Sequence, residues 1–358
     1  MKHPSSISPS SPSWSRRRFL GLSAGAAGAA ITFPSLFGAT DKSGSRPVVI
    51  GAGSHTYECH HGWGKLPSHL TWGETHGVAV DSQGFVYIKH NTGPTKRVQD
   101  SIVVFDPEGQ YVRSFGEEYH GGGHGIDLRK EGSEEFLYLC STRQRLVTKT
   151  TLKGDIVWAC ATPGEPGVYK EGKNFVPTNV AFAPDGGFFV GDGYGSNYIH
   201  RFDAKGKWLQ TWGGTGTKPG EFKTPHGLWW DDRKNLLCVC DRANARLQYF
   251  QPDGTFVSLV EGLLFPAHLD TKGDVLLCPD LHARVTLFDR DNQVIAHLGE
   301  DPEWRKQVLD GFKIRSEPGR WQPGKFIHPH DACFDSQGNI FVVEWVATGR
   351  VTKLKKLA

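Results

Sequence analysis

The chain has 358 residues, 44 of them glycine and 21 proline, and a formal net charge of +3. The first 39 residues hold four basic side chains and no acid, so the rest of the chain carries a formal charge of about −1. A balance this close to neutral excludes a broad basic surface, and we expect no nucleic-acid partner. Abundant glycine and proline with few helix-period stretches indicate an all-β protein of many short strands.

Residues 1–40 have the layout of an export signal. Three arginines, Arg16 to Arg18, precede Phe19 and Leu20, and a stretch rich in glycine and alanine follows up to Ile31. This order is typical of a signal peptide, and the arginine pair resembles a twin-arginine (Tat) signal. The stretch is too short and too weakly apolar for a span of about 20 residues, and no later run is long enough. We predict a Tat signal at 1–40, removed or anchoring, and a periplasmic or extracellular protein.

One hairpin pattern recurs along the remaining chain. In its clearest copy, residues 326–344, an alternating segment and an apolar run flank the turn Asp335-Ser336-Gln337-Gly338. Related units about 50 residues long begin near 76, 124, 179, 226, 268 and 330. Six four-stranded units stacked around an axis form a propeller. The sequence predicts one six-bladed NHL-type β-propeller over residues 46–358, with Arg46–Ile50 as the closing strand and a helix near Pro302–Leu309.

The residue that opens each repeat is expected at the mouth of the central channel. Five of these six residues are histidine, and the sixth is asparagine: His76, His124, Asn179, His226, His268 and His330. The histidines of alternate blades, His124, His226 and His330, would lie about 120° apart. Three imidazoles that converge and leave one side open are typical of a catalytic zinc site. The alternative is that the histidines are inherited from repeat duplication.

Three segments resemble the peptidyl-α-hydroxyglycine α-amidating lyase family of NHL-repeat propellers. They are Gly191-Asp192-Gly193-Tyr194, Pro225-His226 with the Asp-Arg-x-Asn-x-Arg-x-Gln segment 241–248, and Pro329-His330-Asp331. The resemblance implies a metal-dependent lyase that splits a small peptide or amide substrate into an amide and glyoxylate. It implies zinc on His124, His226 and His330, with Tyr194 acting on the substrate hydroxyl. It also implies a structural calcium held by Asp331 and by the main-chain carbonyls of Val78 and Ile126.

This sequence departs from the family pattern at three positions. Asn91 stands where the family has an arginine, and Lys89, Lys96 and Arg97 are the nearby cations that would replace it. His328 stands where the family has methionine, so it would add a ligand or face solvent. Gly195 replaces a disulfide cysteine.

Two other functions stay open for this fold. A non-catalytic NHL propeller would bind a protein or glycan at its mouth. A calcium-dependent, lactonase-like propeller would need oxygen ligands in its channel, where this chain offers imidazoles.

Several further residues have a structural interpretation. Four acids recur at one strand end and are expected to bond turn amides and arginines such as Arg242 and Arg246: Asp192, Asp241, Asp280 and Glu344. The seven cysteines lie mostly in apolar runs, which predicts buried thiols and no disulfide framework. Residues 57–63 hold Cys59, His60 and His61, and we interpret them as a loop into blade one, with a second metal cluster as the alternative.

Overall fold

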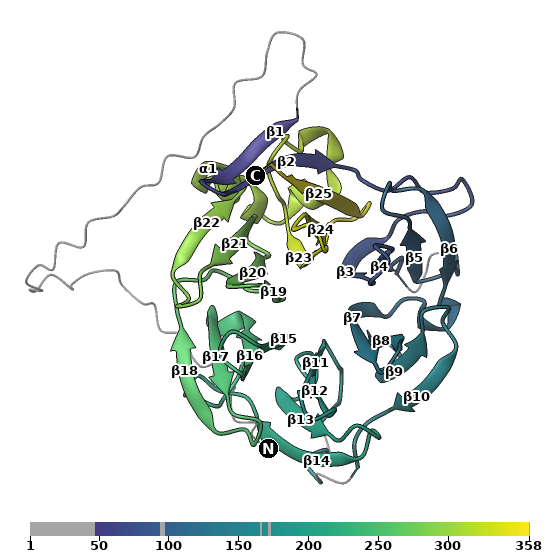
Figure 1. Ribbon diagram of the computed structural model, residues 1–358, viewed down its shortest axis with the longest axis vertical. Helices are drawn as coiled ribbons and strands as arrows, with labels where there is room; N and C mark the ends of the chain where they lie inside the picture. Colours follow the sequence, from purple (N-terminus) through teal and green to yellow (C-terminus); the bar gives the residue numbers. More distant parts are fainter. Residues whose placement is uncertain (1–46, 94–96, 165–166, 171–172, 358) are drawn as a thin grey trace, which may run out of the picture. The chain divides into compact units, whose positions relative to one another are not determined.

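The computed structural model describes residues 47–93, 97–164, 167–170 and 173–357. The predicted Tat signal and Lys96 lie outside these residues. The described strands form six antiparallel sheets arranged around a central channel, so the chain is a six-bladed β-propeller (Figure 1). None of the helices in the described ranges is long and apolar enough to cross a lipid bilayer.

Five blades consist of four consecutive strands, of which the first lies innermost (Figure 1). Blade one is β3 (Glu74–Val80), β4 (Val86–Asn91), β5 (Ile102–Phe105) and β6 (Tyr111–Phe115). Blade two is β7 (Gly123–Glu131), β8 (Glu134–Ser141), β9 (Leu146–Thr151) and β10 (Ile156–Cys160). Blade three is β11 (Val180–Phe182), β12 (Phe188–Gly191), β13 (Tyr198–Phe202) and β14 (Trp208–Gly213). Blade four is β15 (Pro225–Asp231), β16 (Leu236–Asp241), β17 (Arg246–Phe250) and β18 (Phe256–Val260). Blade five is β19 (Asp270–Lys272), β20 (Val275–Asp280), β21 (Arg284–Phe288) and β22 (Val294–Leu298).

Blade six joins the two ends of the described chain. It contains β23 (Pro329–Phe334), β24 (Ile340–Glu344), β25 (Arg350–Lys356), β2 (His55–His61) and β1 (Val48–Ala52), in that order outward. An N-terminal segment therefore closes the ring, and residues 48–50 of the predicted closing segment lie in the outermost strand of blade six, whereas Arg46 lies outside the described residues. The strand β2, which we interpreted as a loop, pairs with β25, and β1 adds a fifth strand outside it.

The predicted hairpin turns form as the sequence indicates. In blade six, Asp335 Oδ1 accepts hydrogen bonds from the amides of Gln337 and Asn339, both at 2.9 Å. Gly338 takes a φ of 84°, which an L side chain rarely adopts.

Apolar side chains fill the spaces between neighbouring blades. One such cluster joins Val78 and Ile88 of blade one to Phe341 and Val343 of blade six, and all four are buried. Full burial of such a side chain contributes about 1.5–3 kcal/mol. These clusters fix the angular position of each blade and therefore of the residues at its inner strand.

The predicted helix, α1 (Pro302–Leu309), lies in the long insertion before blade six. Asp301 caps it by accepting hydrogen bonds from the amides of Glu303 and Trp304 at 3.0 Å. The short 3₁₀ turns η3 (Lys313–Ser316) and η4 (Pro318–Arg320) follow. Two more 3₁₀ turns, η1 (Glu117–Tyr119) and η2 (Arg242–Asn244), follow β6 and β16.

Candidate metal centre

Bulges in the inner strands turn the histidines toward the channel. The pairing of β7 with β8 shifts register between Gly123 and Ile126, so that His124 lies in the bulge. Equivalent shifts surround His226 in β15 and His330 in β23. A bulge re-aims the side chain of the extra residue, which here leaves the sheet and enters the channel.

Each of the three rings is held by the neighbouring blade. The Nδ1 atoms of His124, His226 and His330 donate hydrogen bonds to the carbonyl oxygens of Thr178 (2.7 Å), Ala267 (2.6 Å) and His76 (2.7 Å). The glycines after the first two histidines allow this approach, because a Cβ on Gly125 or Gly227 would lie 2.5 Å from the carbonyl oxygen of Thr178 or Ala267.

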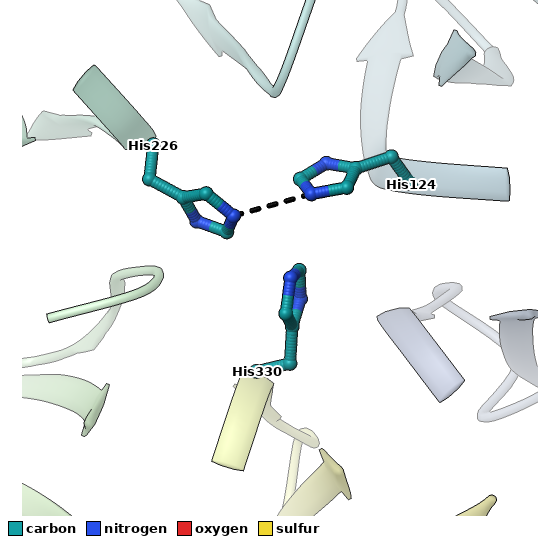
Figure 2. Close-up of side chains that lie close together, drawn as sticks. All are labelled: His124, His226 and His330. Atoms are coloured by element: carbon teal, nitrogen blue, oxygen red, sulfur yellow. Dashed lines mark hydrogen bonds between the residues drawn. The ribbon is translucent and has the colours of Figure 1, made fainter. Parts of the chain in front are cut away.

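The Nε2 atoms of the three histidines converge at one point of the channel (Figure 2). Ligand atoms of the three residues lie within 4.8 Å of one another, and the Nε2 atoms of His124 and His226 are 3.1 Å apart. Because each Nδ1 carries the ring proton, each neutral Nε2 presents a lone pair. Two facing lone pairs repel each other unless a cation lies between them, and two nitrogens on one tetrahedral zinc are about 3.3 Å apart. The donor set and its spacing therefore fit a zinc-type ion.

Burial keeps these imidazoles neutral. Desolvation lowers the pKa of His124, His226 and His330 well below 6.5, and the charge of nearby Arg242 lowers all three further. A neutral imidazole is the form that binds a metal. Protons therefore compete weakly for these ligand atoms at neutral pH.

Tyr194 lies beside the three histidines on the loop after β12. Its hydroxyl is 3.2 Å from Nε2 of His124 and 3.0 Å from Nε2 of His226. Asp192 shapes this loop by accepting hydrogen bonds from the amides of Val176 and Ser196, each at 2.7 Å.

The glycines that flank Tyr194 leave no room for a side chain. A Cβ on Gly193 would lie 2.2 Å from the carbonyl oxygen of Pro225, and one on Gly195 would lie 1.9 Å from Oδ1 of Asp192. The position that holds a cysteine in the resembling family is therefore restricted to glycine here.

Arg242 is the site residue that the sequence argument missed. Its Nη1 donates a hydrogen bond of 3.1 Å to the hydroxyl of Tyr194, and its guanidinium lies over the rings of Tyr194 and Phe265, at 5.2 and 5.0 Å. We expected Arg242 to pair with a strand-end acid, which is wrong. The acid Asp241 is instead saturated by the side chains of Asn244, Arg246 and Gln248, so the motif leaves Arg242 available to the site.

A cavity opens from the three-histidine cluster toward the insertion before blade six. Its volume is about 500 Å³. It is lined by groups of the metal centre and by aromatic and apolar side chains: His76, Tyr194, Arg242, Phe265, Leu281, His282, Phe312, His328, His330 and Trp345. A ligand in this cavity would reach the open side of the three-histidine cluster.

Asp331 lines a second and much smaller cavity, which the three histidines also line. Its Oδ2 accepts a hydrogen bond from the amide of Val78 at 3.0 Å, while its buried Oδ1 has no hydrogen-bond partner. Nε2 of His268 is 3.5 Å from that Oδ1 and 3.6 Å from Oδ1 of Asp127. Burial, followed by the proximity of Asp127, raises the pKa of Asp331 well above its usual value. The cavity of about 10 Å³ has room for one ion, so an unpaired carboxylate oxygen at this place fits a cation.

Lys89 and Arg97, the two expected replacements for the missing arginine that the structure describes, do not reach the cluster. Lys89 is fully buried and donates to the carbonyl oxygens of Cys140 (2.7 Å) and Gly125 (3.3 Å). Arg97 lines a different cavity, together with Asn91. Asn91 itself caps a turn, because its Oδ1 accepts a hydrogen bond from the amide of Gly93 at 2.9 Å.

His328 neither joins the three histidines nor faces solvent. It is completely buried, and its Nδ1 donates to the carbonyl oxygen of Leu281 at 2.7 Å. Burial lowers its pKa to about 4. Its ring packs against Phe312 and Trp345, with centroids 5.2 and 5.5 Å away.

The other sequence interpretations are settled by local contacts. The expected role of the strand-end acids is confirmed at two positions. Asp280 accepts hydrogen bonds from the amides of Leu264 and Phe265, and Glu344 accepts them from the amide of Ile327 and the guanidinium of Arg350.

The expected thiols are observed at Cys59, Cys140, Cys238, Cys240, Cys278 and Cys333. Cys59 Sγ lies 3.4 Å from Nε2 of His61 in β2, but the described residues gather no third ligand there.

Fold and site together define a six-bladed propeller with a buried three-histidine cluster at its channel. No protein-family model matches the chain. It is 32% identical over 184 residues to a mouse peptidyl-glycine alpha-amidating monooxygenase, which covers 49% of this chain and 18% of that protein. The chain thus spans less than a fifth of that relative's length. It is 24% identical over 306 residues to a probable peptidyl-alpha-hydroxyglycine alpha-amidating lyase of Caenorhabditis elegans, which covers 80% of this chain and 83% of that protein.

The fold is also that of solved propellers. A streptogramin B lyase structure superposes with a TM-score of 0.56 at 11% identity, covering 83% of this chain and 97% of that one. The solved structure therefore supports the propeller fold, and the sequence is distantly similar to proteins named as amidating lyases.

Proposed function

We propose that the protein is a metal-dependent carbon–nitrogen lyase that cleaves N-acyl-α-hydroxyglycines, including peptidyl ones, into an amide and glyoxylate. One observation carries the proposal. The Tyr194 hydroxyl lies 3.0–3.2 Å from two converging histidine Nε2 atoms and accepts a hydrogen bond from Arg242. The relationship to amidating lyases supplies the substrate class.

The chain's own residues suit the proton transfers of this reaction. The substrate hydroxyl loses its proton, the C–N bond breaks as a C=O bond forms, and the nitrogen gains a proton to become the amide. Tyr194 is the proposed base, because Arg242 stabilises a negatively charged phenol oxygen through a charged hydrogen bond. Arg242 also offers a cation for the carboxylate of the substrate. A zinc ion on His124, His226 and His330 would supply Lewis-acid polarisation of the reacting hydroxyl.

Metal content and glyoxylate release test the proposal together. We expect near-stoichiometric zinc in the wild type and its loss in a His124→Ala, His226→Ala double variant. The variant His297→Gln is the matched control, because His297 lies in β22, outside the three-histidine cluster, with its Nδ1 3.0 Å from Thr286 Oγ1. Glyoxylate should be released from N-acyl-α-hydroxyglycines by the zinc-containing wild type and control, and not by the double variant. A wild type without transition metal after reconstitution, or one that binds zinc and releases no glyoxylate, would favour a non-catalytic propeller that binds a protein or glycan.

We also propose that Asp331 holds a structural calcium. The unpaired, buried Oδ1 atom supports this assignment. Calcium should raise the melting temperature of the chelated wild type and leave that of Asp331→Asn unchanged. An equal response of both proteins would contradict the assignment.

Export by the Tat route is a further proposal, and it rests on residues 1–40 alone. The buried thiols of Cys140 and Cys238 are compatible with folding before export. Replacement of Arg16, Arg17 and Arg18 by lysine should retain the protein in the cytoplasm. Unchanged export after this replacement would refute the Tat assignment.

A further inference from the structure

The cavity beside the metal centre has one wall made by an unusual residue, Phe312. It is 45% exposed although its ring is large and apolar. Its backbone is left-handed, with a φ of 55°, at the residue before η3. A phenylalanine is disfavoured in this conformation, and its side chain gives η3 no capping hydrogen bond. Neither backbone preference nor burial accounts for phenylalanine at this position.

The insertion that carries Phe312 is packed against the propeller. Trp304 and Val308 of α1 pack with Ile314 of η3 in one buried cluster. Arg315 lies 3.5 Å over the ring of Trp345 and forms an ion pair with Glu74 of blade one. The insertion is thus attached to blades one and six, and it presents Phe312 to the cavity as a fixed wall.

Other aromatic side chains face the same cavity. Trp345 lies 6.4 Å from Phe312, and Phe265 stacks on His282 with ring centroids 4.9 Å apart. Phe265 also contacts Arg242, so the aromatic region continues directly into the site of the proposed reaction. The volume of about 500 Å³ exceeds what the reacting glycine unit needs and leaves room for a bulky group beside it.

We infer that this aromatic pocket, with Phe312 as its wall, binds the residue that precedes the reacting hydroxyglycine and selects an aromatic or large apolar side chain there. The inference rests on the proposed function for the orientation of the ligand. Burying a phenylalanine side chain in such a pocket should strengthen binding about 10- to 100-fold over alanine.

Unreactive peptides test the pocket without requiring turnover. N-acetyl-Phe-Gly and N-acetyl-Ala-Gly lack the α-hydroxyl group, and calorimetry on the zinc-loaded protein gives their affinities. We expect the phenylalanine peptide to bind at least about tenfold more tightly. Binding of the two peptides within threefold of each other, or binding of neither, would overturn the inference.

The variant Phe312→Asn separates a ligand-binding role from a structural one. Asparagine tolerates a left-handed backbone better than phenylalanine, and the ring that is removed is 45% exposed, so the melting temperature should stay close to that of the wild type. The preference for the phenylalanine peptide should nevertheless disappear. A retained preference, or a marked fall in melting temperature, would show that Phe312 has a packing role and overturn the assignment. Val294→Thr, which changes an exposed side chain of β22, is the control and should keep both properties.

Glyoxylate release is measured separately from peptide binding. Preferential binding without any glyoxylate release from the corresponding α-hydroxyglycine would refute the lyase function and leave the pocket assignment standing. Glyoxylate release without a side-chain preference would support the lyase function and refute the pocket assignment.

Discussion

Tyr194→Phe is the change that most directly tests the proposed chemistry. It removes the hydroxyl that contacts His124, His226 and Arg242 at 3.2, 3.0 and 3.1 Å. The ring remains, so the stacking of Arg242 at 5.2 Å is kept. A positioned acid–base group contributes about 10²- to 10⁴-fold to a rate. We therefore expect kcat to fall by that factor, which corresponds to about 2.7–5.4 kcal/mol of activation free energy.

The assay is glyoxylate release at saturating substrate, accompanied by zinc content and thermal unfolding. Because Tyr194 is 41% exposed, the free energy of unfolding should change by no more than about 0.5 kcal/mol. Zinc content should also stay at the wild-type value, because the three ligands are unchanged. A variant with full zinc and a kcat within threefold of the wild type would refute the role of Tyr194 as base.

Three other changes follow from the fold. Arg246→Ala leaves the buried Asp241 carboxylate without its ion pair, so the free energy of unfolding measured by urea titration should fall by about 3–5 kcal/mol. Arg242→Ala should lower it far less. Equal losses in the two variants would contradict this reasoning. Burial lowers the pKa of His200 to about 3, so the unfolded chain gains protons first as the pH falls below 6.5. Above pH 6.5 the wild type should therefore have a larger free energy of unfolding than His200→Gln. Below pH 6.5 this difference should shrink by about 1.4 kcal/mol per pH unit in chemical unfolding, and a constant difference would refute the reasoning. Deleting residues 47–61 removes β1 and β2 and exposes the edge of β25. The melting temperature should fall, and association of the protein, measured by light scattering, should increase. An unchanged melting temperature would contradict the closure of the ring by these strands.

Six blades could be predicted because their signals are local. Alternating residues, Asp-x-x-Gly turns and a recurring inner-strand start identify each unit without any knowledge of its neighbours. The closing strand could not be assigned in the same way. β2 is half-buried and rich in histidine, so its sequence, His55–His61, lacks the apolar alternation of a core strand. Its pairing with β25, almost 300 residues away, is what places it in blade six.

The three-histidine cluster could be predicted because the position of a residue in its repeat determines where it lies in the propeller. Alternate blades bring His124, His226 and His330 to one axis, and the His-Gly pairs in blades two and four signal the bulges that aim them. Arg242 was missed because Asp241 is followed by two arginines in the same motif, and only the strand register pairs the acid with Arg246. The aromatic pocket was missed because its members, such as Phe265, Phe312 and Trp345, come from separate loops with no shared pattern.

The order in which the chain is synthesised has a consequence for the metal centre. Blade six combines the first two described strands with the last three. It contributes His330, whose Nδ1 bonds the carbonyl oxygen of His76 in blade one. A chain still under synthesis can present His124 and His226 but not the third ligand. Assembly of the three-histidine cluster is therefore coupled to ring closure, and an ion that needs all three ligands can bind only after the propeller is complete.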